Sequence, residues 1–203
     1  MDLFSHLANP QENLLPRGGV VNYYGPVLEH DVAEYYFERL LNEVNWQYDE
    51  AKLYGKHIIT KRKVAWYADQ AFDYHYSGTK KRALAWIEPI AELRMLAEEK
   101  TGECFNACLL NLYHTGSESM AWHSDAEKEL KRHGAIASLS LGAERKFCFR
   151  HKGDKEKVEV KLEHGSLLVM KGATQTFWQH CLPATKKVDQ PRISLTFRSM
   201  LSP

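Results

Sequence analysis

Cysteine is scarce in this sequence, whose 203 residues include only four, at positions Cys104, Cys108, Cys148 and Cys181. They do not form the C-x-x-C pairs that are typical of structural zinc sites. We therefore interpret them as reduced thiols, most of which lie in the core or in strands.

Long hydrophobic runs are also missing. No stretch approaches the roughly 18 consecutive apolar residues of a membrane-spanning helix. The first 19 residues, MDLFSHLANPQENLLPRGG, lack a basic segment followed by an apolar one and so do not resemble a secretory signal peptide. We expect a cytoplasmic or nuclear protein that is neither secreted nor attached to a membrane.

Neither sign of charge dominates, because 27 Lys and Arg residues face 26 Asp and Glu residues. The formal net charge of +1 therefore neither requires nor excludes a nucleic-acid partner. Hydrophobic residues make up 44% of the chain, enough for the core of one globular domain. Residues 1–19 are polar and rich in Pro and Gly, so we predict a flexible arm there, a single domain over 20–203, and a monomer.

Two helices are predicted ahead of the strands. The four-residue spacing of Val32, Tyr36, Leu40 and Val44 indicates an amphipathic helix, with Asp31 as its N-cap. A second helix is predicted from Pro89 to Lys100, because proline is tolerated in the first turn and Gly102 is a common stop.

The second half of the chain is dominated by short segments in which apolar and polar residues alternate. They span 106–113, 136–141, 146–151, 158–162, 166–170 and 193–198. Alternation with a period of two, interrupted by polar turns, is typical of antiparallel strands. We predict an α+β fold that is mainly β, a sandwich or jelly roll with the helices buttressing one sheet.

The triplet His123-Ser124-Asp125 places an imidazole and a carboxylate on one face of an extended backbone. With His180 as a third ligand, this pair can form the two-histidine, one-carboxylate site typical of non-haem iron oxygenases. By itself the triplet is weak evidence, because a chain with 10 His and 26 acidic residues produces it easily by chance. A solvated turn is the alternative.

The C-terminal segment PRISLTFR strengthens the case. Its apolar face would build the core, whereas the opposite face carries two arginines with two hydroxyl groups, at Arg192, Ser194, Thr196 and Arg198. Buried guanidinium groups need anionic partners, which a bound dicarboxylate can supply. Six residues separate the two arginine backbones by roughly 20 Å, which argues against a shared small ligand. Surface ion pairs are the alternative.

A second polar pair occurs on another predicted strand, where Asn111 and Tyr113 share a face. Buried amide and phenol groups need hydrogen-bond partners, which neighbouring backbone can also provide. Together with the arginines, these two residues can line a pocket for a dicarboxylate.

A family resemblance runs through these motifs. The segments NLYHTGSESMAWHSDAEKEL, IASLSLGAERKFCFRHK, HGSLLVMKGATQTFWQH and LPATKKVDQPRISLTFR resemble, in this order, the catalytic domain of the AlkB family, nearest its duplex-DNA repair branch. The resemblance covers about residues 50–201. It implies a double-stranded β-helix core at about 104–201, preceded by a nucleotide-recognition hairpin region at about 50–80.

The resemblance also implies an activity and its site. Family members are iron(II)/2-oxoglutarate-dependent dioxygenases, so Fe(2+), 2-oxoglutarate and O2 are expected. The implied iron ligands are His123, Asp125 and His180. The implied 2-oxoglutarate residues are Asn111, Tyr113 and Arg192 at the distal end and Arg198 at the keto-acid end, with Thr196 on the same strand face.

The implied reaction is oxidative demethylation of N-alkylated bases in DNA, such as 1-methyladenine and 3-methylcytosine, with release of formaldehyde, succinate and carbon dioxide. Single-stranded or double-stranded alkylated DNA is the expected partner, with RNA as a further candidate. A base inside a duplex has to be flipped out to reach a buried metal. Aromatic residues on which it can stack cluster in WYADQAFDYHY at 66–76.

By this resemblance, Tyr76 and His123 enclose the base and Tyr74 orients it. The substrate set further includes Arg62, Trp66, a wedge at Leu53, Tyr54 and Gly55 that fills the gap left by the flipped base, and Glu127 as acceptor for an exocyclic amine. Core packing of a β-hairpin is the alternative for each aromatic residue. Ala126 occupies a position that is often acidic in this branch.

Basic residues that can contact phosphates occur in two stretches, at Lys52, Lys56, Lys61, Arg62 and Lys63 and at Arg145, Lys146, Arg150 and Lys152. Solvated surface charge is the ordinary alternative.

Two other functions remain open at this point. One is an RNA-directed or protein-directed oxygenase of the same superfamily, because the metal and cosubstrate residues do not identify the main substrate. The other is a non-catalytic jelly-roll protein that binds nucleic acid.

Overall fold

The computed structural model describes residues 8–53, 56–70, 73–76 and 79–201. Its helices are α1 (His30–Glu43), α2 (Glu88–Thr101) and the short α3 (Thr174–Phe177). The first seven strands are β1 (Val20–Pro26), β2 (Gln47–Leu53), β3 (Lys56–Ala68), β4 (Asp73–Tyr76), β5 (Thr79–Arg82), β6 (Ala107–Tyr113) and β7 (Met120–His123). The remaining six are β8 (Ile136–Gly142), β9 (Arg145–His151), β10 (Lys157–Leu162), β11 (Ser166–Lys171), β12 (Trp178–Leu182) and β13 (Arg192–Arg198).

Both predicted helices are confirmed, with one correction. The first begins at His30, so Asp31 lies in its first turn and is not the N-cap; Glu29 occupies that position without a side-chain cap. The end of α2 is as predicted, because Gly102 adopts a left-handed conformation (φ 69°) and its N–H donates to the carbonyl of Glu98.

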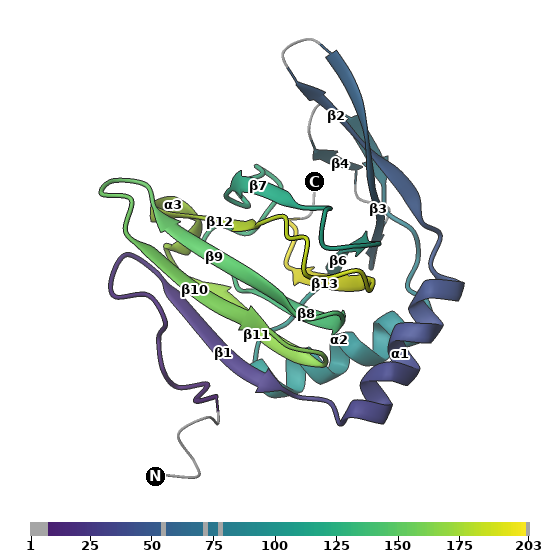
Figure 1. Cartoon of the computed structure of the whole chain (residues 1–203), viewed down its shortest axis with the longest axis horizontal. Helices are drawn as coiled ribbons and strands as arrows, with labels where there is room; N and C mark the ends of the chain where they lie inside the picture. Colours follow the sequence, from purple (N-terminus) through teal and green to yellow (C-terminus); the bar gives the residue numbers. More distant parts are fainter. Residues whose placement is uncertain (1–7, 54–55, 71–72, 77–78, 202–203) are drawn as a thin grey trace.

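The strands form two facing antiparallel sheets (Figure 1). The larger sheet has the order β1-β11-β8-β13-β6-β3-β2, and the smaller has the order β10-β9-β12-β7. β4 and β5 form a separate two-stranded pair. The predicted mainly β, jelly-roll fold is confirmed.

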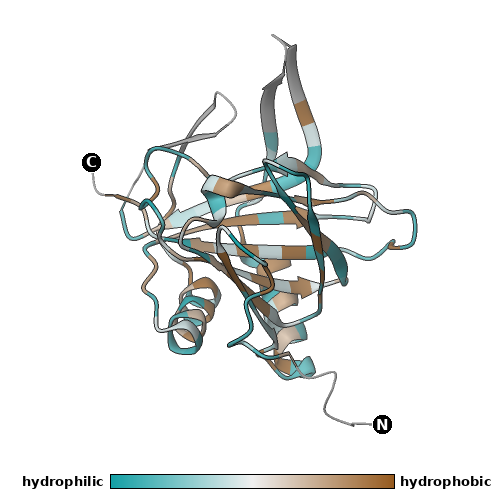
Figure 2. Cartoon of the chain, turned by 90° about the vertical axis from the view of Figure 1, so that its left-hand side faces the viewer, coloured by the Kyte–Doolittle hydropathy of each residue, from teal (hydrophilic) through white to brown (hydrophobic). Residues whose placement is uncertain are grey.

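The two faces of the larger sheet have different roles. On one face, apolar residues of the central strands pack against α1 and α2; Ile193, Leu195 and Phe197 are fully buried there. The opposite face turns toward the smaller sheet and carries the polar residues that alternate with them. Figure 2 shows this alternation of hydrophobic and hydrophilic residues along the central strands. The alternation predicted from PRISLTFR therefore places its apolar residues in the core and its polar residues on the face toward the smaller sheet.

The segment before β1 packs more closely than a flexible arm would. Leu15 is only 2% exposed and belongs to a second core cluster with Phe149 and Trp178. The indole N–H of Trp178 donates to the carbonyl of Arg17 at 2.9 Å. Residues 1–7 lie outside the described part of the chain. No helix of the described residues is long and apolar enough to cross a membrane.

Candidate metal centre and adjoining cavity

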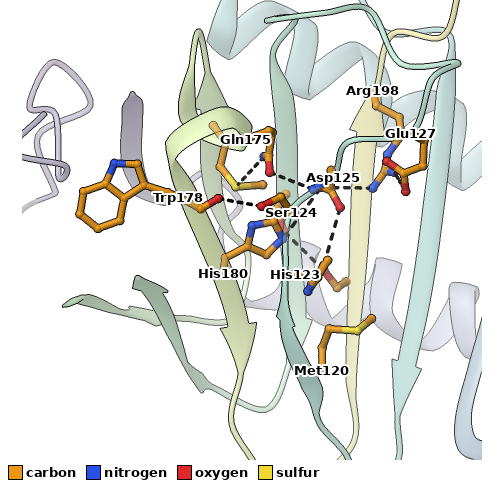
Figure 3. A network of polar contacts seen from close by, with 12 residues as sticks. Met120, His123, Ser124, Asp125, Glu127, Gln175, Trp178, His180 and Arg198 are labelled. Carbon is orange, nitrogen blue, oxygen red and sulfur yellow. Dashed lines mark hydrogen bonds and ion pairs between the residues drawn. The ribbon is translucent and has the colours of Figure 1, made fainter. Parts of the chain in front are cut away.

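Three side chains, two from the adjacent strands β7 and β12 and one from the segment that follows β7, come close together. His123 ends β7 and is paired with His180 of β12, so the two imidazoles lie side by side with ring centroids 4.2 Å apart. Asp125 follows two residues after His123. Its carboxylate oxygens lie 3.7 Å from His123 Nε2 and 3.9 Å from His180 Nε2 (Figure 3). One ligand atom from each residue lies within 4.8 Å of the other two, as a shared metal ion requires.

Hydrogen bonds outside the three ligands hold them in place. His123 Nδ1 lies 2.8 Å from the carbonyl of Ala121. Donation through Nδ1–H leaves Nε2 with a lone pair toward the centre. The backbone N–H of Asp125 donates to Gln175 Oε1 at 2.9 Å, and Ser124 Oγ donates to the carbonyl of Trp178 at 2.8 Å (Figure 3).

The protonation states suit a cation. Burial lowers the pKa of His180 to about 3 despite the opposing effect of Asp125, so its imidazole is neutral. Burial opposes ionisation of Asp125, but Arg198 and the two histidines outweigh it and lower the pKa of this carboxyl. Two imidazoles and one carboxylate are a donor set that fits iron(II) and leaves coordination positions open.

A cavity extends from this centre along the polar face of the larger sheet. Its walls include the three metal-site residues and all five residues that the sequence predicted to bind 2-oxoglutarate, namely Asn111, Tyr113, Arg192, Thr196 and Arg198. The separation of Arg192 from Arg198 along β13 therefore does not exclude a shared cavity.

The end of the cavity at Tyr113 fits an anion. Arg192 is 3% exposed, and its Nη2 donates to Ser140 Oγ at 2.8 Å. Its Nε and Asn111 Oδ1 are buried without a hydrogen-bond partner among the described residues. Burial lowers the pKa of Arg192 to about 10, which still leaves it charged at neutral pH. A buried cation with an unused donor is where a distal carboxylate of 2-oxoglutarate would bind.

Arg198 lies at the other end of the same strand, beside the metal site. It is 2% exposed, and its guanidinium nitrogens lie 3.7 Å from Asp125 Oδ2 and 3.9 Å from Glu127 Oε1 (Figure 3). Its predicted role at the keto-acid end of the cosubstrate stays a prediction.

Two of the residues predicted to bind substrate are buried in the protein instead. Trp66 is 3% exposed in a core cluster with Ala68 and Met200, which supports the alternative of core packing. Arg62 is 6% exposed and forms an ion pair with Asp49. Strand β3 therefore buries both side chains in this structure, and their predicted roles in substrate binding stay predictions.

The other candidates for base binding fall partly outside the description. Tyr54 and Gly55 lie outside the described residues. For Leu53, Tyr74 and Tyr76, the structure gives only the strand and its pairing, with Tyr74 opposite Lys81 in the β4–β5 pair. Their predicted roles therefore stay predictions.

The second basic stretch also needs a correction. Arg145 is only 2% exposed and donates to backbone carbonyls, so it cannot contact a phosphate. Lys146 forms an ion pair with Glu159, at 2.6 Å. Arg150 lies over the ring of Trp122, with 4.3 Å from Cζ to the ring centroid.

Some residues of the site have no clear sequence signal. Gln175 lies 50 positions after Asp125 and is recognisable only from the fold. Ser138 and Ser140 line or support the cavity, and the alternation in IASLSL would have placed them on its face. A larger cavity of about 520 Å³ opens on the other side of Asp125 and also contacts Glu127.

Comparisons with known proteins agree with this geometry. Residues 20–198 match the 2OG-Fe(II) oxygenase superfamily. The chain is similar to the DNA oxidative demethylase ALKBH2 of Homo sapiens, with 35% identity over 207 residues that cover 97% of this chain and 79% of that protein. It is also similar to the alpha-ketoglutarate-dependent dioxygenase alkB homolog 3 of Homo sapiens, with 37% identity over 177 residues covering 83% and 62% of the two chains.

One solved structure, OsALKBH1, superimposes with a TM-score of 0.61 over 91% of this chain and 99% of that one. At 16% identity, this likeness supports the fold alone.

Proposed function

We propose a function from the premise that this chain belongs to the 2OG-Fe(II) oxygenase superfamily and, within it, to the AlkB family. The protein is an iron(II)/2-oxoglutarate-dependent dioxygenase. Its proposed reaction is the oxidative demethylation of N-alkylated bases in DNA, with 1-methyladenine and 3-methylcytosine as substrates. The observation that carries this proposal is the meeting of the His123, Asp125 and His180 group with an arginine-lined cavity.

Bound iron would supply the activation of O2, which the side chains cannot perform. One oxygen atom enters the N-methyl carbon, which leaves as formaldehyde while the base nitrogen regains its lone pair. The other oxygen atom enters succinate, which forms from 2-oxoglutarate with loss of carbon dioxide. The protein residues bind, orient and shield the reactants.

The proposed cosubstrate site uses both ends of the cavity. Arg192 and Tyr113 bind the distal carboxylate, and Arg198 stabilises negative charge next to the metal. Asn111 contributes a polar contact in between. Since the walls come from β6 and β13, which are paired over their whole length, the two ends are held at a fixed separation.

The proposed base site is on the open side of the metal centre. The side chain of His123 is 28% exposed, whereas that of Asp125 is 8% exposed. A base that stacks on His123 would have Glu127 within reach as an acceptor for its exocyclic amine, because Glu127 is anchored beside Arg198. Human ALKBH2 is named a DNA oxidative demethylase, which supports DNA as the substrate here.

The proposal is tested by incubating the protein with iron(II), 2-oxoglutarate and ascorbate on oligonucleotides that carry one methylated base. Single-stranded and duplex DNA and RNA are compared, and mass spectrometry follows the loss of 14 mass units per methyl group, a value fixed by the formula CH2. We expect demethylation of DNA with release of formaldehyde.

The Asp125→Ala protein is the matched control and should show no loss of mass. Turnover of 2-oxoglutarate without demethylation of any oligonucleotide would contradict the base-repair proposal and favour a protein-directed oxygenase. Demethylation of RNA alone would identify RNA, in place of DNA, as the substrate.

A further inference from the structure

Arg145, the first residue of β9, lies behind the cavity wall rather than in it. Its guanidinium group donates to the backbone carbonyls of Glu118 at 2.9 Å and Pro183 at 2.8 Å, with longer contacts to Thr115 and Gly116. These acceptors belong to two loops, the one between β6 and β7 and the one between β12 and β13. All of them are neutral carbonyl groups, so none of them compensates the positive charge of the buried Arg145.

Three guanidinium groups surround the ring of Tyr113. The distances from Cζ to the ring centroid are 5.9 Å for Arg62, 5.9 Å for Arg145 and 5.6 Å for Arg192. Contacts below about 6 Å are in the range of cation–π attraction. The ring therefore has three cations close to it, and Tyr113 lines the cavity together with Arg192.

These three cations differ in their counter-ions. Arg62 is paired with Asp49, whereas neither Arg145 nor Arg192 has a carboxylate within ion-pair distance among the described residues. Burial lowers the pKa of Arg145, and Tyr113 and the Glu118 carboxylate oppose this effect. The Glu118 carboxylate accepts hydrogen bonds from the backbone and ring of His114. The Tyr113 end of the cavity thus holds two buried positive charges that the protein leaves without a paired anion.

We propose that Arg145 is a positioning residue that makes the cavity selective for 2-oxo acids carrying a second carboxylate. It orients Tyr113 and raises the positive potential behind it, while Arg192 contacts the carboxylate directly. The inference rests on the proposed cosubstrate site. Arg145 lies outside the cavity wall, and its loss should weaken only the binding of the distal carboxylate.

A purely structural role makes a different prediction. Gly116 is enclosed by the carbonyls of Thr185 and Val188, which would lie 2.6 and 2.7 Å from a Cβ atom there, so the two loops are packed tightly around Arg145. If Arg145 only held these loops together, its loss would lower stability and weaken every 2-oxo acid alike.

The test compares two ligands by titration calorimetry on the anaerobic iron(II) protein. 2-Oxoglutarate has the distal carboxylate, and 2-oxopentanoate lacks it but keeps the same 2-oxo acid end. For Arg145→Met, we expect 2-oxoglutarate to bind about ten-fold more weakly and 2-oxopentanoate to change less than about two-fold. Arg145→Lys should recover most of the affinity, because it keeps the charge and loses the fork of hydrogen bonds.

The matched control is Lys146→Met, which removes the neighbouring cation on the outer surface and should change neither affinity. If Arg145→Met does not fold, Arg145→Gln replaces it, because glutamine is neutral but still donates to carbonyls. Equal weakening of both acids, equal damage by Lys and Met, or no change in either acid would overturn the proposal. Failure of the unaltered protein to bind 2-oxoglutarate would instead contradict the proposed function.

Discussion

The two ends of the cavity balance their charges in different ways. At the metal end, the Asp125 carboxylate faces Arg198 and two imidazoles, so the protein supplies both the anion and the cation. At the Tyr113 end, Arg192 and Arg145 have no carboxylate partner among the described residues. Buried charges are stable only when they are compensated. The comparison suits the proposed function, in which a metal ion would complete one end and the distal carboxylate of 2-oxoglutarate the other.

This difference predicts which substitutions act on which step. Loss of a metal-end residue should remove the bound metal and with it the reaction. Loss of a cation at the Tyr113 end should leave the metal in place and weaken only the cosubstrate.

Replacement of a metal ligand is the strongest test of the metal end. We expect Asp125→Ala, His123→Ala or His180→Ala to lower turnover by at least about a hundred-fold, because each deletes a ligand while little core volume is lost. Circular dichroism should show an intact fold, and metal analysis should show reduced iron content. Asp189→Ala, at an exposed carboxylate, is the control. Normal demethylation by Asp125→Ala at subsaturating iron would refute the metal assignment.

Arg192→Met is the corresponding test of the Tyr113 end. It removes the guanidinium that lines the cavity, so the KM for 2-oxoglutarate should rise by about ten-fold to a hundred-fold, the value of a charged hydrogen bond, with iron content unchanged. Arg39→Met, on the surface of α1, should leave the KM as it is. A loss of bound iron in Arg192→Met would mean that the two ends are not independent.

Substitution of Tyr54 tests whether the protein also acts on duplex DNA. Neither end of the cavity determines this property. An inserted ring recovers stacking only where a flipped base has left a gap. If Tyr54 is that ring, Tyr54→Ala should lower activity on duplex DNA by about ten-fold and leave single-stranded activity within about two-fold. A parallel decrease on both substrates would assign Tyr54 to packing.

Substitution of Glu127 tests the charge near the metal end, because Glu127 lies next to Arg198 on the side where the base is proposed to bind. 1-Methyladenine and 3-methylcytosine are cationic at neutral pH, so a nearby carboxylate should favour them over neutral 3-methylthymine. Glu127→Gln should reduce that preference by about three-fold to ten-fold, a change of roughly 1 kcal/mol. Glu144→Gln, on an exposed turn, serves as control. Equal rates on charged and neutral lesions by the unaltered enzyme would contradict this electrostatic explanation.

The last and smallest change concerns how the stability of the iron-free protein depends on pH. The fold favours neutral His180, since burial lowers its pKa from 6.5 to about 3. The stability linked to this residue is therefore complete above pH 6.5 and decreases as the pH falls toward 3. Denaturant unfolding of the iron-free protein should show this decrease, and His180→Gln should show a flatter pH profile in the same range. Identical profiles would mean that His180 is not buried in the neutral form.

Much of the site was predictable from local sequence, and the reason is the period of a β-strand. Alternation in PRISLTFR separates Arg192 and Arg198 from the core residues between them, and the i, i+2 spacing places His123 and Asp125 on one side. The same rule places Asn111 beside Tyr113. These assignments depend only on neighbouring residues, so no tertiary information was needed for them.

Burial could not be predicted in this way. Trp66 and Arg62 lie in a stretch rich in basic and aromatic residues, as a binding surface is, yet the structure buries both side chains. The residue type and sequence neighbours of Arg145 are those expected of a surface cation, but two loops enclose its side chain. Burial depends on segments distant in sequence, which local patterns cannot report.

Local sequence was therefore enough to predict the strands, the face on which each polar residue lies, and the family with its metal and cosubstrate. Long-range packing was needed to show which cations reach solvent, which are paired, and which face the proposed cosubstrate site. The physical reason is that side-chain direction follows from the local backbone, whereas burial and counter-ions follow from long-range packing: His180 meets His123 across 57 residues, and Arg145 meets Pro183 across 38.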